Sequence, residues 1–255
     1  MKSQGVSGSS ELPCIHGCVR CTYRQGRPFC NFGPEALRYF DKIGHSVNYR
    51  RGAALFSEGQ RPSVVSVLCQ GKVRLSTTSS EGKRMILCLA QPGDVLGLSA
   101  VLGGEAYEVT AEAASPCRVR QVKLNDFLVF VNRFAEAGVH AAQCLNMDYR
   151  QALQNLRRVT LSVSAAEKLA AFLLESANRY AVSRSTESKV DLGLTHEEIG
   201  QILDMSRETV SRLFGRFKRQ GLITVRGGTV TIRNRKELSR LLGIQSDPRL
   251  PHQMT

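Results

Sequence analysis

The stretch "LTHEEIGQILDMSRETVSRLFGRFKRQGLI" constrains the fold of this 255-residue chain more than any other. Thr195 and Glu198 form a capping box that predicts the start of one helix, and Ser206 can cap a second helix that begins at Arg207. Gly221 is predicted to end the second helix in the left-handed conformation. The buried face of this helix is predicted from the spacing i, i+3, i+4 and i+7, which gives Val210, Leu213, Phe214 and Phe217. Two helices joined by so short a turn are typical of a helix-turn-helix.

A β-hairpin is predicted directly after these helices. The β-rich runs "LITVR" and "TVTIR" are separated by Gly227 and Gly228, a pair typical of tight primed turns. A helix-turn-helix followed by a hairpin indicates a winged helix.

The exposed face of the second helix has the chemistry of a reader of the DNA major groove. It carries Arg207, Glu208, Ser211 and Arg212. Arginine can bond guanine O6 and N7, and glutamate can accept from cytosine N4. Residues 201–243 hold ten basic and three acidic residues, in a chain of net charge +13. Among them, Arg216, Lys218 and Arg226 are predicted to contact phosphates. We therefore expect binding to double-stranded DNA, although a merely solvated basic face and a binder without sequence preference are the alternatives.

Before the winged helix, the periodicity of apolar residues changes from that of strands to that of a helix near residue 125. Residues 34–124 have short alternating apolar runs separated by glycines, which predict an antiparallel barrel or roll. A heptad stripe then predicts a long helix. Because no second long helix is predicted to cover that stripe, we expect a homodimer. The stripe consists of Ala135, Gly138, Ala142, Leu145, Tyr149, Ala152, Leu156 and Val159.

These patterns predict an α+β chain in five parts. The expected parts are a flexible start with a cysteine segment (1–33), an antiparallel β-roll (34–130), a dimerisation helix (131–160), a winged helix-turn-helix (161–243) and a flexible tail (244–255). Since no run of eighteen apolar residues and no signal peptide occurs, we expect a cytoplasmic protein without a membrane span. We also expect no enzyme, because no phosphate-binding glycine loop, H-E-x-x-H motif or nucleophile–base pair is recognisable.

Four cysteines stand within seventeen polar residues, in "CIHGCVRCTYRQGRPFC" from Cys14 to Cys30. The cytoplasm keeps thiols reduced, which favours metal or redox chemistry over disulfides. The residues leave three alternatives open. These are a thiol switch, ordinary unliganded thiols, and a zinc site formed by Cys14, Cys18, Cys21 and Cys30. Cys69, Cys88 and Cys144 are interpreted as small buried hydrophobic residues.

The chain resembles the bacterial Crp/Fnr regulators, typified by the catabolite activator protein and the fumarate–nitrate reduction regulator. "SRETVSRLFGRFKRQGLI" is similar to the family's recognition helix, and residues 56–98 are similar to its effector roll. The resemblance covers residues 14–243. It implies a dimeric activator or repressor that binds palindromic DNA, with RNA polymerase as a further partner. The pattern E-x-x-S-R resembles the oxygen-responsive, Fnr-like branch.

In that branch, three N-terminal cysteines and one from the roll hold a [4Fe–4S] cluster. The resemblance implies Cys18, Cys21 and Cys30 as the three, and Cys117, in "ASPCRVRQVKL", as the fourth. The eight-residue gap between Cys21 and Cys30 is longer than the family's, so Cys14 could replace Cys18 or Cys30.

A cyclic nucleotide is not expected in the roll. Relatives that bind cyclic AMP carry G-E-L and an Arg-Ser pair, where this chain has "GLS" and, near the second position, Tyr107 and Glu108. A buried phosphate beside Glu108 without an arginine would lack its charge-assisted pair.

Overall fold

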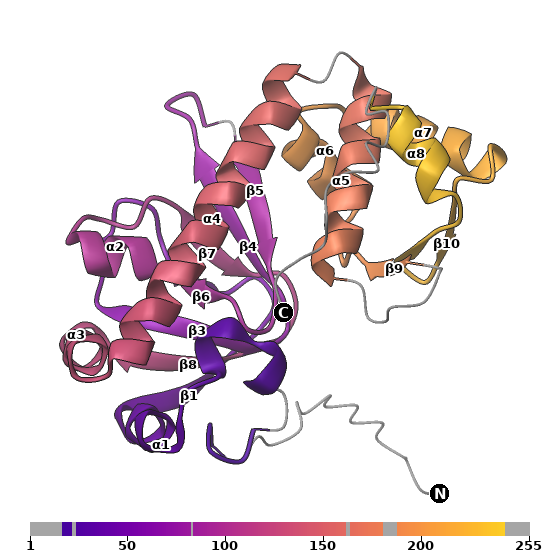
Figure 1. Cartoon of the computed structure of the whole chain (residues 1–255). Helices are drawn as coiled ribbons and strands as arrows, with labels where there is room; N and C mark the ends of the chain where they lie inside the picture. The colour runs from indigo at the N-terminus through magenta and orange to yellow at the C-terminus, as the bar shows by residue number, and fades with distance from the viewer. Residues whose placement is uncertain (1–16, 22–23, 83, 162–163, 181–187, 243–255) are drawn as a thin grey trace, which may run out of the picture. The chain divides into compact units, whose positions relative to one another are not determined.

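The computed structural model describes residues 17–21, 24–82, 84–161, 164–180 and 188–242 (Figure 1). Cys14, the tail from residue 244 and the start of the chain lie outside the described residues. The chain divides into two compact units, which are described separately below. The first comprises residues 1–77 and 88–149, and the second comprises residues 78–87 and 150–255.

The predicted antiparallel roll lies in the first unit, except for residues 78–87. Its strands form two four-stranded sheets, ordered β1-β8-β3-β6 and β2-β7-β4-β5. The strands are β1 (Gly44–Tyr49), β2 (Ala54–Phe56), β3 (Val64–Gln70), β4 (Val73–Thr78), β5 (Arg84–Ala90), β6 (Val95–Leu96), β7 (Thr110–Ala113) and β8 (Cys117–Lys123).

The two faces of the β1-β8-β3-β6 sheet belong to two different apolar clusters. On β3, Val65 and Val67 belong to an outer cluster, whereas Leu68 belongs to the cluster inside the roll. On β8, Val119 lies inside the roll and Val122 lies in the outer cluster. This alternation follows from the two-residue period of a strand.

Helices α1 (Pro34–Ile43), α2 (Leu98–Gly103) and α3 (Leu124–Arg133) accompany the roll. The prediction of β-structure for residues 34–124 was wrong at residues 34–43, which form α1. Pro34 occupies the first turn of α1, where its missing N–H costs nothing, and Ala36, Leu37 and Phe40 are buried at helical spacing. Since this apolar face is only three residues long, the sequence pattern did not separate the helix from the strands that follow.

The long helix α4 spans Ala135–Leu161. Its inner face packs on the outer cluster through Ala137, Ala141 and Cys144. Another face leaves large apolar side chains exposed, including Val139 (55%) and Tyr149 (63%). Five residues of the predicted stripe are exposed: Ala135, Ala142, Tyr149, Ala152 and Leu156. Gly138 and Leu145 are half-buried, and Val159 lies outside the residues whose side chains are described.

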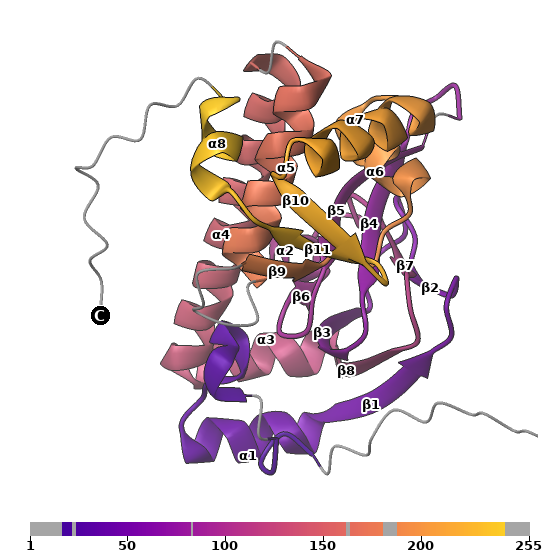
Figure 2. The ribbon, with the colours of Figure 1, turned by 90° about the vertical axis from the view of Figure 1, so that its right-hand side faces the viewer.

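The second unit contains the predicted winged helix. Its elements are α5 (Ala165–Tyr180), β9 (Ser188–Asp191), α6 (His196–Leu203), α7 (Arg207–Arg219), β10 (Ile223–Arg226), β11 (Thr229–Ile232) and α8 (Arg235–Arg240). Figure 2 shows β9, β10 and β11 side by side, in the sheet order β10-β11-β9. Strand β9 has four residues, and no sequence pattern predicted it.

The predicted caps of the helix-turn-helix are confirmed. The Thr195 hydroxyl accepts from the Glu198 N–H, and the Glu198 carboxylate accepts from the Thr195 N–H, which completes the capping box. The Ser206 hydroxyl accepts from the Thr209 N–H. Gly200 lies within α6 and faces the turn that follows it. A Cβ there would stand 2.5 Å from the Met205 carbonyl oxygen, so glycine is required for so close an approach.

None of the helices in the described part of the chain is long and apolar enough to cross a membrane.

Candidate nucleic-acid interface and metal centre

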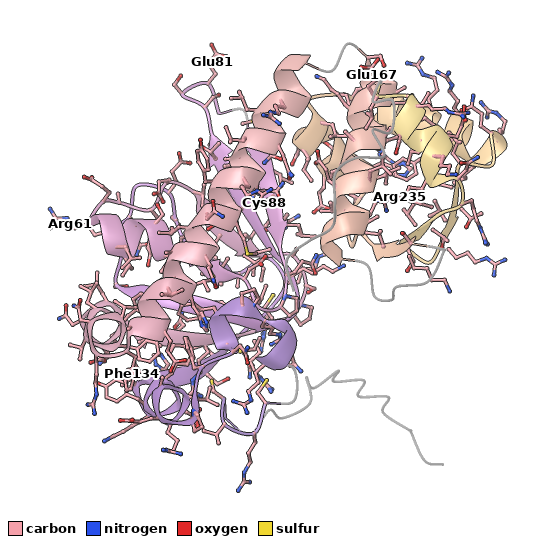
Figure 3. The ribbon with its side chains drawn as sticks, viewed as in Figure 1. Arg61, Glu81, Cys88, Phe134, Glu167 and Arg235 are labelled. Atoms are coloured by element: carbon pink, nitrogen blue, oxygen red, sulfur yellow. The ribbon has the colours of Figure 1, made fainter. Side chains whose placement is uncertain are left out.

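Helix α7 presents the predicted DNA-reading residues on one exposed face. Val210, Leu213, Phe214 and Phe217 form the opposite, buried face, as predicted. Figure 3 shows nitrogen-tipped side chains projecting from this region of the module. The predicted phosphate contacts on α7 and on β10 of the wing are exposed as well. All seven predicted DNA-binding residues are therefore accessible: Arg207, Glu208, Ser211, Arg212, Arg216, Lys218 and Arg226.

His196, at the first position of α6, contacts Ser211, one of the predicted DNA-binding residues. Its ring stacks on Phe214, with ring centroids 4.8 Å apart, and its Nδ1 lies 2.8 Å from the Ser211 hydroxyl. Partial burial lowers the pKa of His196, and the charges of Lys218 and Arg207 lower it further. At neutral pH the ring is therefore uncharged, and it fixes the direction of the Ser211 hydroxyl. Because this contact joins two helices, no short-range sequence pattern indicated it.

Replacement of His196 by phenylalanine tests this link, because it retains the stacking on Phe214 and removes Nδ1. The folded pKa lies below the unfolded value of 6.5, so the contribution of His196 to the unfolding free energy is complete above pH 6.5. That contribution is lost as the pH falls through 6.5 toward the lowered folded pKa. We expect the wild type to lose more thermal stability than His196→Phe between pH 7.5 and pH 5.5. Equal losses would contradict the assigned protonation state.

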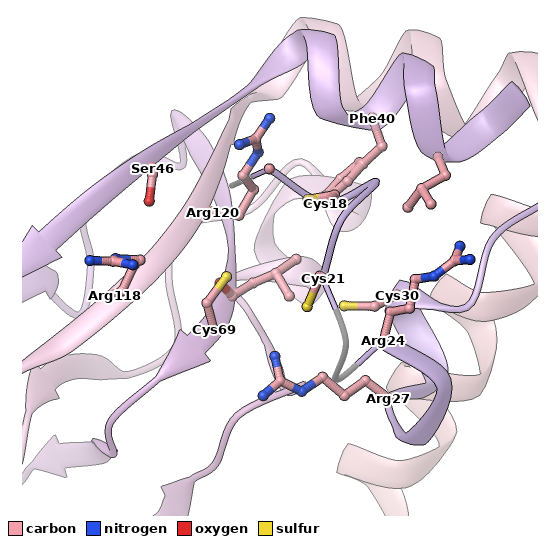
Figure 4. Close-up of a pocket in the computed structure, with 13 residues that line it drawn as sticks. Cys18, Cys21, Arg24, Arg27, Cys30, Phe40, Ser46, Cys69, Arg118 and Arg120 are labelled. Atoms are coloured by element: carbon pink, nitrogen blue, oxygen red, sulfur yellow. The ribbon is translucent and has the colours of Figure 1, made fainter. Parts of the chain in front are cut away.

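The N-terminal cysteines gather in a pocket on the outer face of the first unit. Cys18, Cys21 and Cys30, three of the predicted ligands, line it together with Cys69 (Figure 4). The pocket is partly open to solvent, and its cavity volume is about 40 Å³. In Figure 4 the sulfur atoms of Cys21 and Cys30 face each other, and Cys69 approaches from the β3 side.

Short local turns and the neighbouring helix position these thiols. The Cys21 N–H donates to the Cys18 carbonyl oxygen (3.2 Å), and the Cys30 N–H donates to the Arg27 carbonyl oxygen (2.9 Å). The Cys18 N–H donates to the Asp41 carboxylate on α1 (2.7 Å). That carboxylate also pairs with Arg120 of β8 at 2.8 Å. The cysteine segment is thus tied to both α1 and the roll.

Burial keeps the thiols of Cys18, Cys30 and Cys69 protonated when no cation is bound. Burial raises the pKa of both Cys18 and Cys30 to about 12, and Cys69 adds repulsion at each. The pKa of Cys69 is also raised, chiefly by burial, while the charge of Arg27 lowers it. A soft cation would favour the thiolate form in such a place.

The structure does not bring Cys117 to this pocket. Cys117 is fully buried in the cluster inside the roll, where its thiol can donate to the carbonyl oxygens of Lys72 (3.1 Å) and Ser115 (3.0 Å). Cys69, which the sequence analysis interpreted as a buried hydrophobic residue, lines the pocket instead. Cys144 is buried in the outer cluster, and this burial raises its pKa to about 12.

The described residues contain no group of three or more His, Cys, Asp and Glu side chains that could hold a single metal ion. The four pocket thiols are thus not drawn together tightly enough for one tetrahedral zinc ion, whose ligands lie about 2.3 Å from the metal.

Comparison with known proteins agrees with this architecture. Residues 167–241 match the model of a Crp-like helix-turn-helix domain, and residues 46–134 match that of a cyclic nucleotide-binding domain. The chain is 30% identical over 212 residues to the transcriptional activatory protein AadR of Rhodopseudomonas palustris, covering 81% of this chain and 85% of AadR. The chain belongs to the Crp/Fnr family of transcriptional regulators.

Two further similarities cover most of this Crp/Fnr regulator. The anaerobic regulatory protein of Aggregatibacter actinomycetemcomitans is 26% identical over 235 residues, covering 90% of this chain and 89% of that protein. The structure of FixK2 from Bradyrhizobium japonicum is similar with a TM-score of 0.70 and 27% identity, covering 78% of this chain and 97% of FixK2.

The interior of the roll in this Crp/Fnr regulator is filled by its own side chains. The Tyr107 ring stacks on Phe56 with centroids 4.0 Å apart, and its hydroxyl donates to the Val64 carbonyl oxygen (2.9 Å). Leu96 and Ala100 are buried in the same cluster. Arg74 of β4 pairs with Glu112 of β7. These contacts support the expectation that no cyclic nucleotide binds there, which stays a prediction.

Proposed function

We propose that this Crp/Fnr regulator is a homodimer that binds palindromic DNA specifically and senses oxygen through a [4Fe–4S] cluster held by its N-terminal cysteines. The observation that carries the proposal is the pocket in which Cys18, Cys21, Cys30 and Cys69 meet. The name of the anaerobic regulatory protein supports a link to oxygen. The proposed place of action is the cytoplasm, where the DNA lies, and RNA polymerase is the proposed partner in transcription.

The DNA side of the proposal rests on α7 and the wing. Because the exposed face of α7 carries Arg207, Glu208, Ser211 and Arg212, it can read base edges in a major groove. In a dimer, two such helices would lie one turn of DNA apart, about 34 Å, over a palindrome. The large apolar side chains exposed on α4, such as Val139 and Tyr149, support a second copy of this chain as the partner of that helix.

The pocket residues fit an iron–sulfur cluster in kind, number and surroundings. Four cysteines match the usual ligand set of [4Fe–4S], and the irons of a cluster spread their thiolates more widely than one zinc ion does. Arg27 and Arg120 stand near enough to favour the thiolate forms of Cys30 and Cys18, respectively. When bound, the cluster supplies iron–thiolate bonds that oxygen destroys.

The residues between the cysteines and α4 can transmit the state of the pocket. Phe29 and Phe32, which flank Cys30, are buried in the outer cluster together with Ala137 and Ala141 of α4. The Phe32 ring stacks on that of His140, with centroids 5.2 Å apart. The next residue, Gly33, donates its N–H to the Glu136 carboxylate at 2.9 Å. A change in how Cys30 is held therefore reaches the first turns of the helix proposed to form the dimer.

A zinc or thiol switch on the same fold is the alternative. The described thiols are not arranged for a single ion, which counts against a zinc site formed by Cys18, Cys21, Cys30 and Cys69.

The experiment is metal analysis of full-length protein purified without oxygen, together with gel shifts on palindromic and scrambled duplexes. We expect about four iron atoms per subunit, visible absorbance that air bleaches, and a shift of the palindrome that air abolishes. Colourless protein that contains zinc would reject the cluster while leaving the DNA-binding part of the proposal intact.

A further inference from the structure

We propose that Cys69, on β3, is the fourth ligand of the iron–sulfur cluster, in place of Cys117. This inference rests on the proposed cluster and adds the identity of the residue that attaches it to the roll. Its basis is the side of the sheet on which each cysteine lies.

The two cysteines occupy opposite faces of the β1-β8-β3-β6 sheet. Cys117 shares the interior cluster with Val119. The alternate residues of β8, Arg118 and Arg120, line the pocket that Cys18, Cys21 and Cys30 share. Cys69 lines that pocket too, and it follows Val65 and Val67 of the outer cluster at the two-residue spacing of one face.

A break in the strand pairing supports the orientation of Cys69. The pairing of β3 with β8 runs Leu68 to Val119 and then Gln70 to Arg118, so Cys69 has no partner of its own in the ladder. A bulge of this kind places an extra residue in one strand and can re-aim its side chain. The Cys69 thiol can donate to the Val67 carbonyl oxygen, at 3.6 Å.

Cys117 could reach the N-terminal thiols only after a rearrangement of β8. A slip of one residue would turn Cys117 outward, but it would also expel Val119 from the interior and carry Arg118 and Arg120 into it. Such a slip would also break the pairing of β8 with β1. That pairing comprises six residue pairs, one of which joins Val119 to Val47. The space around the Cys117 sulfur is also filled, because a Cβ at Gly71 would stand 2.8 Å from it.

The test compares Cys69→Ser with Cys117→Ala in the full chain, purified without oxygen, with iron content and visible absorbance as the readouts. We expect Cys117→Ala to retain the iron of the wild type and Cys69→Ser to lose most of it. Loss of iron in Cys117→Ala with retention in Cys69→Ser, or retention in both, would overturn the assignment while the cluster itself stands. A wild type without iron would instead reject the proposed cluster, and this inference with it.

A second measurement covers the case in which Cys117→Ala fails to fold, since that side chain is fully buried. The wild-type protein is alkylated before and after removal of its iron by a chelator, and the modified cysteines are identified by peptide mass. We expect Cys69 to become modified only after iron removal, together with Cys18, Cys21 and Cys30, while Cys117 behaves alike in both states. Equal labelling of Cys69 in both states would contradict its role as a ligand.

Discussion

Replacement of Arg212 by alanine is expected to abolish discrimination at one base pair of each half-site. Arg212 is exposed on the same face of α7 as Glu208 and Ser211, while Val210 and Phe214 anchor the opposite face in the core. A bidentate contact from arginine to guanine discriminates by about 1–3 kcal/mol. Binding to the palindrome should weaken by about that amount in each half-site, with little change in affinity for unrelated duplex. Fluorescence anisotropy on single-base variants of the palindrome measures both quantities.

Arg226→Ala is the matched control, because Arg226 lies in the wing rather than on α7. Its proposed contact is a phosphate, so its removal should weaken binding about equally on all sequences and reduce the slope of affinity against salt by about one. If Arg212→Ala behaves in the same way as Arg226→Ala, the protein binds without reading bases through Arg212.

Replacement of Tyr149 by glutamate is expected to separate the dimer and to remove high-affinity DNA binding. Tyr149 is 63% exposed on α4, on the face that also carries Val139 and Leu153. A charge buried between two helices without a partner is strongly destabilising. Losing the second recognition helix removes the gain from bivalent binding, which is roughly 10²- to 10⁴-fold. Sedimentation equilibrium measures the first effect, and a titration of palindromic duplex measures the second.

Gln154→Glu provides the control for the added charge. Gln154 is exposed on the same helix but lies to one side of the face that contains Tyr149 and Leu153. This variant should remain dimeric and should bind the palindrome as the wild type does. A Tyr149→Glu protein that is still a dimer would show that α4 does not form the subunit contact through this face.

The sequence predicted those features that neighbouring residues determine. The capping box of Thr195 and Glu198 and the Ser206 cap depend on residues three positions apart, and both are confirmed. Gly221, Gly227 and Gly228 all have positive φ, as the turn chemistry required. The antiparallel roll, the long helix and the winged helix of the predicted α+β fold follow from these local patterns, and the comparisons confirm the family.

The composition of the thiol pocket could not be predicted in the same way. Whether Cys69 or Cys117 faces the N-terminal cysteines depends on strand register and on a bulge, which short-range patterns do not determine. Both residues stand in β-like runs, so the face that each one occupies depends on how the strands pair. The contact of His196 with Ser211 likewise joins two helices, and only their packing reveals it. The alternation of apolar and basic residues along β8 was the available signal for Cys117. It places Cys117 on the same face as Val119 and on the face opposite to Arg118 and Arg120.

The most direct measurement titrates a palindromic duplex, and a scrambled one, with full-length protein before and after exposure to air. We predict that the iron-loaded protein binds the palindrome as two subunits per duplex, prefers it clearly over the scrambled sequence, and loses that preference as the visible absorbance bleaches. Equal affinity for both duplexes, unchanged by air, would contradict a specific DNA-binding dimer that is controlled by thiolate-held iron.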